Sequence, residues 1–325
     1  MTHPDRREFL QRSASCSSWL LGLFAVSPLA ARRAFAESAE AKIVAKEKWG
    51  RLEELGEGVW SLVSTPFETR DFTTVSNGGI IAGTDRVLVV EAFNQPAGAK
   101  WLAEKARELT GRWPTDVVVT HFHSDHSAGS AGFTTDQAAT KLWLTDETRS
   151  RIEKQNRAMP RPAKMLEDIG SIATDEPVKL DLGERTVTIA SHEGHTDSDV
   201  TIEVSDENLV FCGDLFFNKL IPNYSDAKPR ALKKTVAGLR RDEKTRYVPG
   251  HGAIASPTDL ELYREFLAMM EESVRAAHQK GLGIKEAAAQ FRLPKAFADW
   301  YIFSPQVVPR AFNAWYAEFD KKEPA

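Results

Sequence analysis

Short apolar runs separated by polar turns cover most of the chain after residue 57. Strands are predicted where β-branched and other apolar residues form runs bounded by turn residues. The clearest are 58–63, 78–82, 86–90 and 116–120, and the turn Gly83-Thr84-Asp85 predicts a hairpin between the second and the third. Four further strands are predicted at 178–180, 187–189, 200–204 and 209–212.

Helical periodicity appears between and after these strands. In residues 96–110 it places Trp101, Leu102, Ala106 and Leu109 on one face, which we expect to be buried. Further helices are predicted at 145–158, 228–240, 257–279 and 284–291. In this arrangement, the polar motifs that carry the candidate chemistry come at the ends of strands, on loops held by a sheet.

The segments that flank this central part differ from it. Residues 37–56 are read as a polar lead-in. The C-terminal segment, 261–325, carries an aromatic cluster at Phe297, Trp300, Tyr301, Phe303, Phe312, Trp315, Tyr316 and Phe319. The spacing of its last four members is helical. We expect this face to pack on the rest of the chain. A homodimer interface, where aromatic residues are enriched, and a lid over a substrate are the alternatives.

Residues 1–36 resemble a twin-arginine export signal. Arg6-Arg7 precedes Phe9-Leu10, an apolar stretch runs from Trp19 to Ala31, and Ala34-Phe35-Ala36 is a small-x-small cleavage pattern. The apolar stretch is too short for a comfortable membrane span. We therefore expect a periplasmic or secreted protein with no stable membrane anchor after cleavage.

Composition narrows the classes of function. The hydrophobic fraction of 42% and the charged fraction of 27% are ordinary for a globular protein. Cleavage after Ala36 leaves 37 basic and 44 acidic residues, a net charge of −7. This balance disfavours nucleic acid as a partner, because binding it requires a basic surface. The mature chain keeps one cysteine, Cys212, so it has no intramolecular disulfide.

Four metal-capable side chains follow the apolar run Val117-Val118-Val119 within a few residues: His121, His123, Asp125 and His126. Residues i and i+2 of an extended segment point to the same side, so His121 and His123 can bind one ion together. Asp125 and His126 come where the chain turns and can face a second ion. Burial of these groups without partners would be costly, which argues against a packing role.

Three further candidates stand alone in the sequence. They are His195 in Gly194-His195-Thr196, Asp214 after Gly213, and His251 between Gly250 and Gly252. Imidazole and carboxylate ligands suit zinc, iron or manganese and need no thiolate. The sequence thus predicts two divalent metal ions, with zinc favoured and iron or manganese as alternatives.

These motifs, taken in order over roughly residues 57–260, resemble the metallo-β-lactamase fold superfamily. The resemblance implies an α/β fold, a four-layered αβ/βα sandwich with its active site along one edge, followed here by a C-terminal helical extension. It assigns the first metal to His121, His123 and His195, the second to Asp125, His126 and His251, and a bridging role to Asp214.

Differences between this sequence and the best-known members of the superfamily indicate which of its branches the chain resembles. Asp214 stands where zinc β-lactamases carry cysteine, which favours the glyoxalase II-like, general hydrolase branch. Glu91 is a candidate to orient a ligand histidine, and so are Asp197 and Asp199, for which N-capping or turn formation is an equal alternative. His192 is a candidate proton carrier, although we favour a structural role for it.

We therefore predict an exported dinuclear metallohydrolase that acts on a small molecule. A metal-bound hydroxide would attack an ester, lactone, thioester or amide carbonyl, with Asp125 as a metal ligand and candidate proton acceptor. Candidate substrate contacts are Asn218, Lys219 and Tyr224. The alternatives are β-lactam hydrolysis, mono-iron sulfur or redox chemistry, and a non-catalytic periplasmic accessory module. The complete set of ligands for a second metal ion argues against a mono-iron enzyme.

Overall fold

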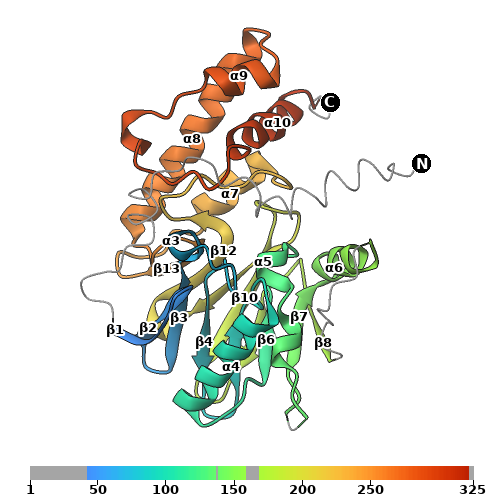
Figure 1. Ribbon diagram of the computed structural model, residues 1–325, viewed down its shortest axis with the longest axis vertical. Helices are drawn as coiled ribbons and strands as arrows, with labels where there is room; N and C mark the ends of the chain where they lie inside the picture. Colours follow the sequence, from blue (N-terminus) through green and yellow to red (C-terminus); the bar gives the residue numbers. More distant parts are fainter. Residues whose placement is uncertain (1–41, 137, 159–167, 322–325) are drawn as a thin grey trace.

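The computed structural model describes residues 42–136, 138–158 and 168–321 (Figure 1). The predicted export signal lies outside these ranges. Eight strands form the first sheet in sequence order: β1 (Lys42–Glu47), β2 (Gly50–Gly56), β3 (Val59–Ser64), β4 (Gly78–Ala82), β5 (Val87–Val90), β6 (Asp116–Val118), β7 (Lys141–Thr145) and β8 (Ile169–Ile172). Neighbours from β1 to β5 are antiparallel, and those from β5 to β8 are parallel.

The second sheet has five strands in the order β13-β12-β11-β10-β9. Its strands are β9 (Val178–Asp181), β10 (Thr186–His192), β11 (Asp199–Val204), β12 (Leu209–Phe217) and β13 (Arg246–His251). Only the pair β12 and β13 is parallel. The α-helices are α3 (Pro66–Thr69), α4 (Pro96–Thr110), α5 (Ser124–Ser127), α6 (Asp146–Ala158), α7 (Pro229–Gly238), α8 (Pro257–Gln279), α9 (Ile284–Gln290) and α10 (Val307–Phe319).

Alternation of apolar side chains along the strands builds the layers. In β5, Leu88 and Val90 face the second sheet, while Val87 and Val89 face α4. In β12, Phe211 faces the first sheet. Its neighbour Cys212 packs toward α7 and α8, fully buried as expected of a free strand cysteine. The order of layers is helix, sheet, sheet, helix, which confirms the predicted αβ/βα sandwich.

The C-terminal helices pack on the outer face of the second sheet, next to α7 (Figure 1). Seven of the eight aromatic residues singled out above are buried there, and only Phe319 is partly exposed. This segment thus packs on the rest of the chain, whereas a homodimer through it stays a prediction. None of the helices in the described part of the chain has both the length and the apolar character of a membrane span.

Two local expectations differ from the structure. The expected polar lead-in over 37–56 contains β1 and β2, and β2 is largely buried. Its charged residues hid this strand, because Arg51 and Glu53 form a buried ion pair at 2.6 Å. In α4, Leu109 is exposed, and the small side chain of Ala103 lies in the buried face instead. The division of the chain into domains stays a prediction.

Candidate metal centre

The loop after β6 carries four of the seven candidate ligands. His121 and His123 lie in the bend that follows β6, and His123, whose backbone is extended (φ −60°, ψ 146°), is the N-cap of the short helix α5. Helix α5 then presents Asp125 and His126. The change from extended to helical backbone separates the two pairs, so that each pair can serve a different ion.

The other three ligands come from the second sheet. His195 lies between β10 and β11, and His251 is the last residue of β13. Asp214 lies inside β12, not past its end as expected. Gly213 has a φ of +50° there, and the pairing of β12 with β13 shifts register. Such a bulge redirects the next side chain, here toward the loops of the first sheet.

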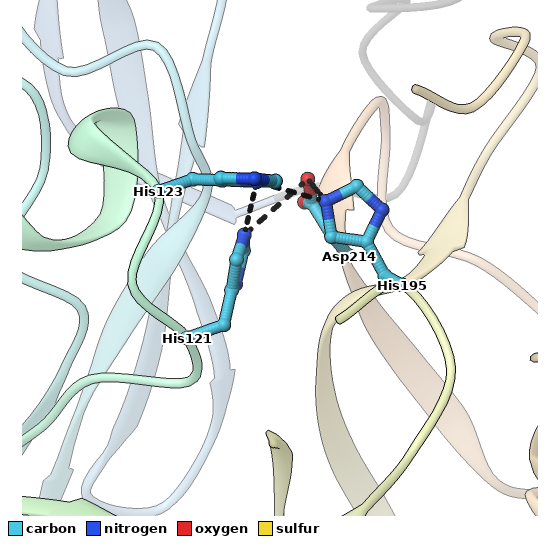
Figure 2. Close-up of side chains that lie close together, drawn as sticks. All are labelled: His121, His123, His195 and Asp214. Atoms are coloured by element: carbon cyan, nitrogen blue, oxygen red, sulfur yellow. Dashed lines mark hydrogen bonds and ion pairs between the residues drawn. The ribbon is translucent and has the colours of Figure 1, made fainter. Parts of the chain in front are cut away.

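The first group joins ligands from both sheets (Figure 2). His123 Nδ1 lies 3.0 Å from His121 Nε2 and 3.0 Å from His195 Nε2. Asp214 Oδ2 lies 3.2 Å from His195 Nε2 and 3.8 Å from His121 Nε2. One carboxylate oxygen and three imidazole nitrogens therefore converge on one point.

The second group lies on the other side of Asp214. His126 Nε2 and His251 Nε2 are each 3.2 Å from Asp214 Oδ1. Asp125 Oδ2 is 3.6 Å from His126 Nε2 and 3.4 Å from His251 Nε2. The two oxygens of Asp214 thus face different groups, which is the arrangement expected of a bridging carboxylate.

Both groups fit a divalent metal ion. Ligand bonds of roughly 2.0–2.1 Å in a tetrahedral site place neighbouring donor atoms roughly 3.3 Å apart, and the observed separations span 3.0–3.8 Å. Asp125 Oδ2, His126 Nε2 and Asp214 Oδ1 are buried and make no hydrogen bond among the described residues. Buried polar atoms without such partners are rare, and here all three point to one place.

The charges of the second group compensate one another. Burial alone would raise the pKa of Asp214, but His251, His126 and His195 together hold it well below its ordinary value. Burial lowers the pKa of His251, yet Asp214 and Asp125 raise it to about 9. Without a metal, protons on the histidines balance the carboxylates. A divalent cation would take over that charge and release protons.

Two histidines of the first group, His121 and His195, have the opposite character. Burial lowers the pKa of His195 to about 3 and, with help from the neighbouring His126 and His123, brings that of His121 well below its ordinary value. These two imidazoles are therefore neutral at physiological pH. The neutral form is the one that binds metal ions.

Glu91 lies where a partner for a ligand histidine was expected. Its Oε1 is 2.9 Å from His126 Nδ1 and accepts a hydrogen bond from Thr120 Oγ1 at 2.6 Å. Thr120 Oγ1 also lies 3.1 Å from His121 Nδ1. Glu91 adopts a φ of +76°, an unfavourable backbone for a non-glycine residue. The fold thus holds a strained residue at the position that orients His126.

Asp199 and Asp197 differ in what they contact. Asp199 accepts hydrogen bonds from Thr196 N and Oγ1, both at 2.9 Å, and so shapes the turn that holds His195. Asp197 reaches no ligand histidine. It pairs with Arg151 at 2.5 Å, a partner on α6 that the sequence alone did not suggest.

His192 contacts the neighbouring strand, and its structural role stays a prediction. Its Nε2 lies 2.9 Å from Thr201 Oγ1 on the neighbouring strand β11. Burial, and then the charge of Arg241, lower its pKa. The histidine is not among the side chains that converge on either metal group.

The three candidate substrate contacts lie on one segment but face different ways. Lys219 points to Asp259 at the start of α8, with 3.7 Å between the charged atoms. Asn218 donates a side-chain hydrogen bond to Ala253 O at 3.0 Å. The expectation that Tyr224 contacts the substrate is wrong. Tyr224 is 2% exposed and packs in the core under the C-terminal helices, where a substrate would not reach it.

Asp226 was missed. Its Oδ2 lies 2.9 Å from His123 Nε2, the ring nitrogen that faces away from the first group. Burial would raise the pKa of Asp226, but the contact with His123 lowers it. An ionised Asp226 fixes the proton on Nε2 and leaves Nδ1 free to bind a metal. No local pattern marks this residue, which lies 103 positions after its partner.

Comparison with known proteins agrees with this geometry. Residues 72–251 match the family model described as the metallo-beta-lactamase superfamily. An uncharacterized protein of Mycobacterium leprae, ML0493, is 28% identical over 58% of the chain and 89% of that protein. The human acyl-coenzyme A thioesterase MBLAC2 is 22% identical over 53% of the chain and 68% of that protein.

Solved structures share the fold at lower identity. A metallo beta lactamase from Hirschia baltica is 19% identical, with a TM-score of 0.55 over 68% of this chain and 98% of that one. The sec-alkylsulfatase Pisa1 from Pseudomonas sp. is 14% identical and has a TM-score of 0.67. That match covers 95% of this chain and 62% of the sulfatase, so it includes the C-terminal helices.

Proposed function

We propose a specific function from the premise that the chain belongs to the metallo-β-lactamase superfamily. The chain is a metal-dependent hydrolase with a His/Asp metal site. The further proposal is a dinuclear enzyme, with zinc as the favoured ion, that cleaves an ester, lactone, thioester or amide. The observation that carries it is the placement of Asp214, whose two oxygens face two separate ligand groups.

The residues of the chain would divide the work as follows. His121, His123 and His195 would hold one ion and Asp125, His126 and His251 the other, with one oxygen of Asp214 facing each group. Two such ions supply an acidified water and Lewis acidity toward the carbonyl. Burial would raise the pKa of Asp125, but His126 and His251 lower it, so its carboxylate is ionised and available to hold a metal ion.

The substrate class and location complete the proposal. Asp214 in the place of cysteine favours the glyoxalase II-like branch over β-lactam hydrolysis. The likeness to the human acyl-coenzyme A thioesterase supports a thioester among the four classes. The signal-like residues 1–36 support export to the periplasm by the twin-arginine route.

A panel of substrates tests the function. Zinc-loaded protein would be assayed with an acyl-coenzyme A, a glutathione thioester, an aryl ester, a lactone and a chromogenic cephalosporin. Turnover of one non-lactam class that vanishes both on chelation and in an Asp125→Ala/His126→Ala variant supports the proposal. Turnover of the cephalosporin alone would favour the β-lactamase alternative. Turnover that survives in the double variant would contradict a dinuclear mechanism.

A further inference from the structure

Two buried residues at the end of the β3–β4 connection touch both segments that supply the second metal group, helix α5 and the end of β13. Ser76 and Asn77 precede β4 and are 0% and 2% exposed. They lie far in sequence from Asp125 and from His251, yet each contacts the backbone of one of these ligand segments. Neither residue belongs to a ligand set or to a sequence motif described above.

Asn77 brackets His251. Its side-chain amide donates to Pro249 O at 2.9 Å and to Gly252 O at 2.7 Å, one carbonyl on each side of the histidine. Its backbone N–H donates to Gly250 O at 2.8 Å. Both amide hydrogens are thus used on the His251 loop.

The His251 loop needs such support because glycines flank the ligand. A Cβ at Gly250 would lie 2.0 Å from Asp214 Oδ1, so the close approach to the bridging carboxylate excludes any side chain there. Gly252 has a φ of +102°. Glycine backbones have little conformational preference of their own. The hydrogen bonds from Asn77 therefore supply an order that the loop sequence cannot.

Ser76 performs the matching contact on the other ligand segment. Its Oγ donates to Asp125 O at 2.7 Å. Both residues are anchored through Ser64 on β3, which is itself fully buried. The Ser64 hydroxyl donates to Ser76 O at 2.5 Å, and its backbone N–H donates to Asn77 Oδ1 at 2.9 Å. One strand end thereby fixes two ligand segments relative to each other.

We propose that Asn77 and Ser76 are positioning residues for the second metal ion, which set the placement of His251 and Asp125. The inference rests on the proposed dinuclear function. It is selective, because the ligands of the first group are held by other contacts, such as that of Asp226 with His123. Loss of the Asn77 or Ser76 side chain should weaken the binding of the second ion and leave the binding of the first ion unchanged.

Chelator titration of zinc-loaded protein tests this selectivity, with the released zinc counted at each step. The variants are Asn77→Ala and the milder Ser76→Ala. Each has a matched control that removes a side-chain hydrogen bond to a carbonyl away from the ligand loops. Asn94→Ala removes the bond to Phe72 O at 2.8 Å, and Ser61→Ala removes that of an equally buried serine to Gly78 O at 3.1 Å. The Asp125→Ala/His126→Ala variant identifies which release step belongs to the second ion.

We expect the dissociation constant of the second ion to rise about ten- to a hundredfold in Asn77→Ala, since loss of an outer partner of a ligand has this effect. The rise should be smaller in Ser76→Ala, and both controls should match the wild type. Equal weakening of both ions, or a variant that behaves like its control, would overturn the inference while the wild type still binds two ions. A wild type that holds fewer than two ions would overturn the proposed function itself, and this inference with it.

Discussion

The two halves of the metal centre are supported by different kinds of partners. Behind the second group stand Glu91, which directly follows β5, and Asn77, which directly precedes β4, both at most 2% exposed. Behind the first group stand the buried Asp199 and Thr120, but also two partly exposed side chains, Asp226 at 37% and Arg151 at 39%. The second group is thus supported by buried residues, while part of the support of the first group comes from exposed side chains on a loop and on α6.

Replacing Asp214 should affect both metal groups equally, because one oxygen of this residue faces each group. We expect Asp214→Asn to lose tight binding of both ions and to lower kcat/KM about a thousandfold or more, since the amide lacks the negative charge that two cations require. Zinc content and turnover measure this. Asp85→Asn, on an exposed turn, is the control. Retention of two tightly bound ions in Asp214→Asn would exclude a bridging role.

Replacing Glu91 tests the buried support of the second metal group. In Glu91→Gln the charge that pairs with His126 is lost, so the second ion should bind about ten- to a hundredfold more weakly. The first ion should change little. Stepwise zinc release by a chelator separates the two ions. A loss confined to the first ion would reverse the proposed assignment of the halves.

Replacing Asp226 tests the exposed part of the support of the first metal group in the same way. Asp226→Asn keeps the size of the side chain but removes the charge that faces His123 Nε2. The first ion should be weakened about tenfold, at the lower end of the range for such partners, because water can reach the site and replace part of the contact. Unchanged binding of the first ion would show that the contact does not orient His123.

The smallest effect is expected at Arg151. It lies over the ring of Phe122 at 5.3 Å and pairs with Asp197, and so connects the segments of two first-group ligands. An exposed ion pair of this kind contributes little, so Arg151→Gln should weaken the first ion by about fivefold at most. Arg149→Gln, which removes an exposed pair on the same helix, is the matched control. A difference beyond tenfold between the two would show a larger role for Arg151 than its exposure suggests.

Local sequence patterns predicted those site residues that are marked by their immediate neighbours in the sequence. His121 to His126 form one continuous segment, and glycines mark the turns around His195 and His251, so all seven members of the two candidate groups were singled out. The strands that are continuous apolar runs, such as β4 and β5, were also predicted within a residue or two.

The missed features depend on contacts between distant segments. Asn77 acts on carbonyls 172 and 175 residues away, and no spacing rule links such positions. Strand β2 was hidden because Arg51 and Glu53 neutralise each other only once the chain has folded. Tyr224 was misassigned because its surroundings come from the C-terminal helices, which the loop sequence does not reveal.

The most direct test of the dinuclear centre is anomalous diffraction from crystals of the zinc-loaded protein. We predict two peaks, one among His121, His123 and His195 and one among Asp125, His126 and His251, with one oxygen of Asp214 beside each. A single peak in fully loaded crystals, or a second peak away from Asp214, would contradict the account.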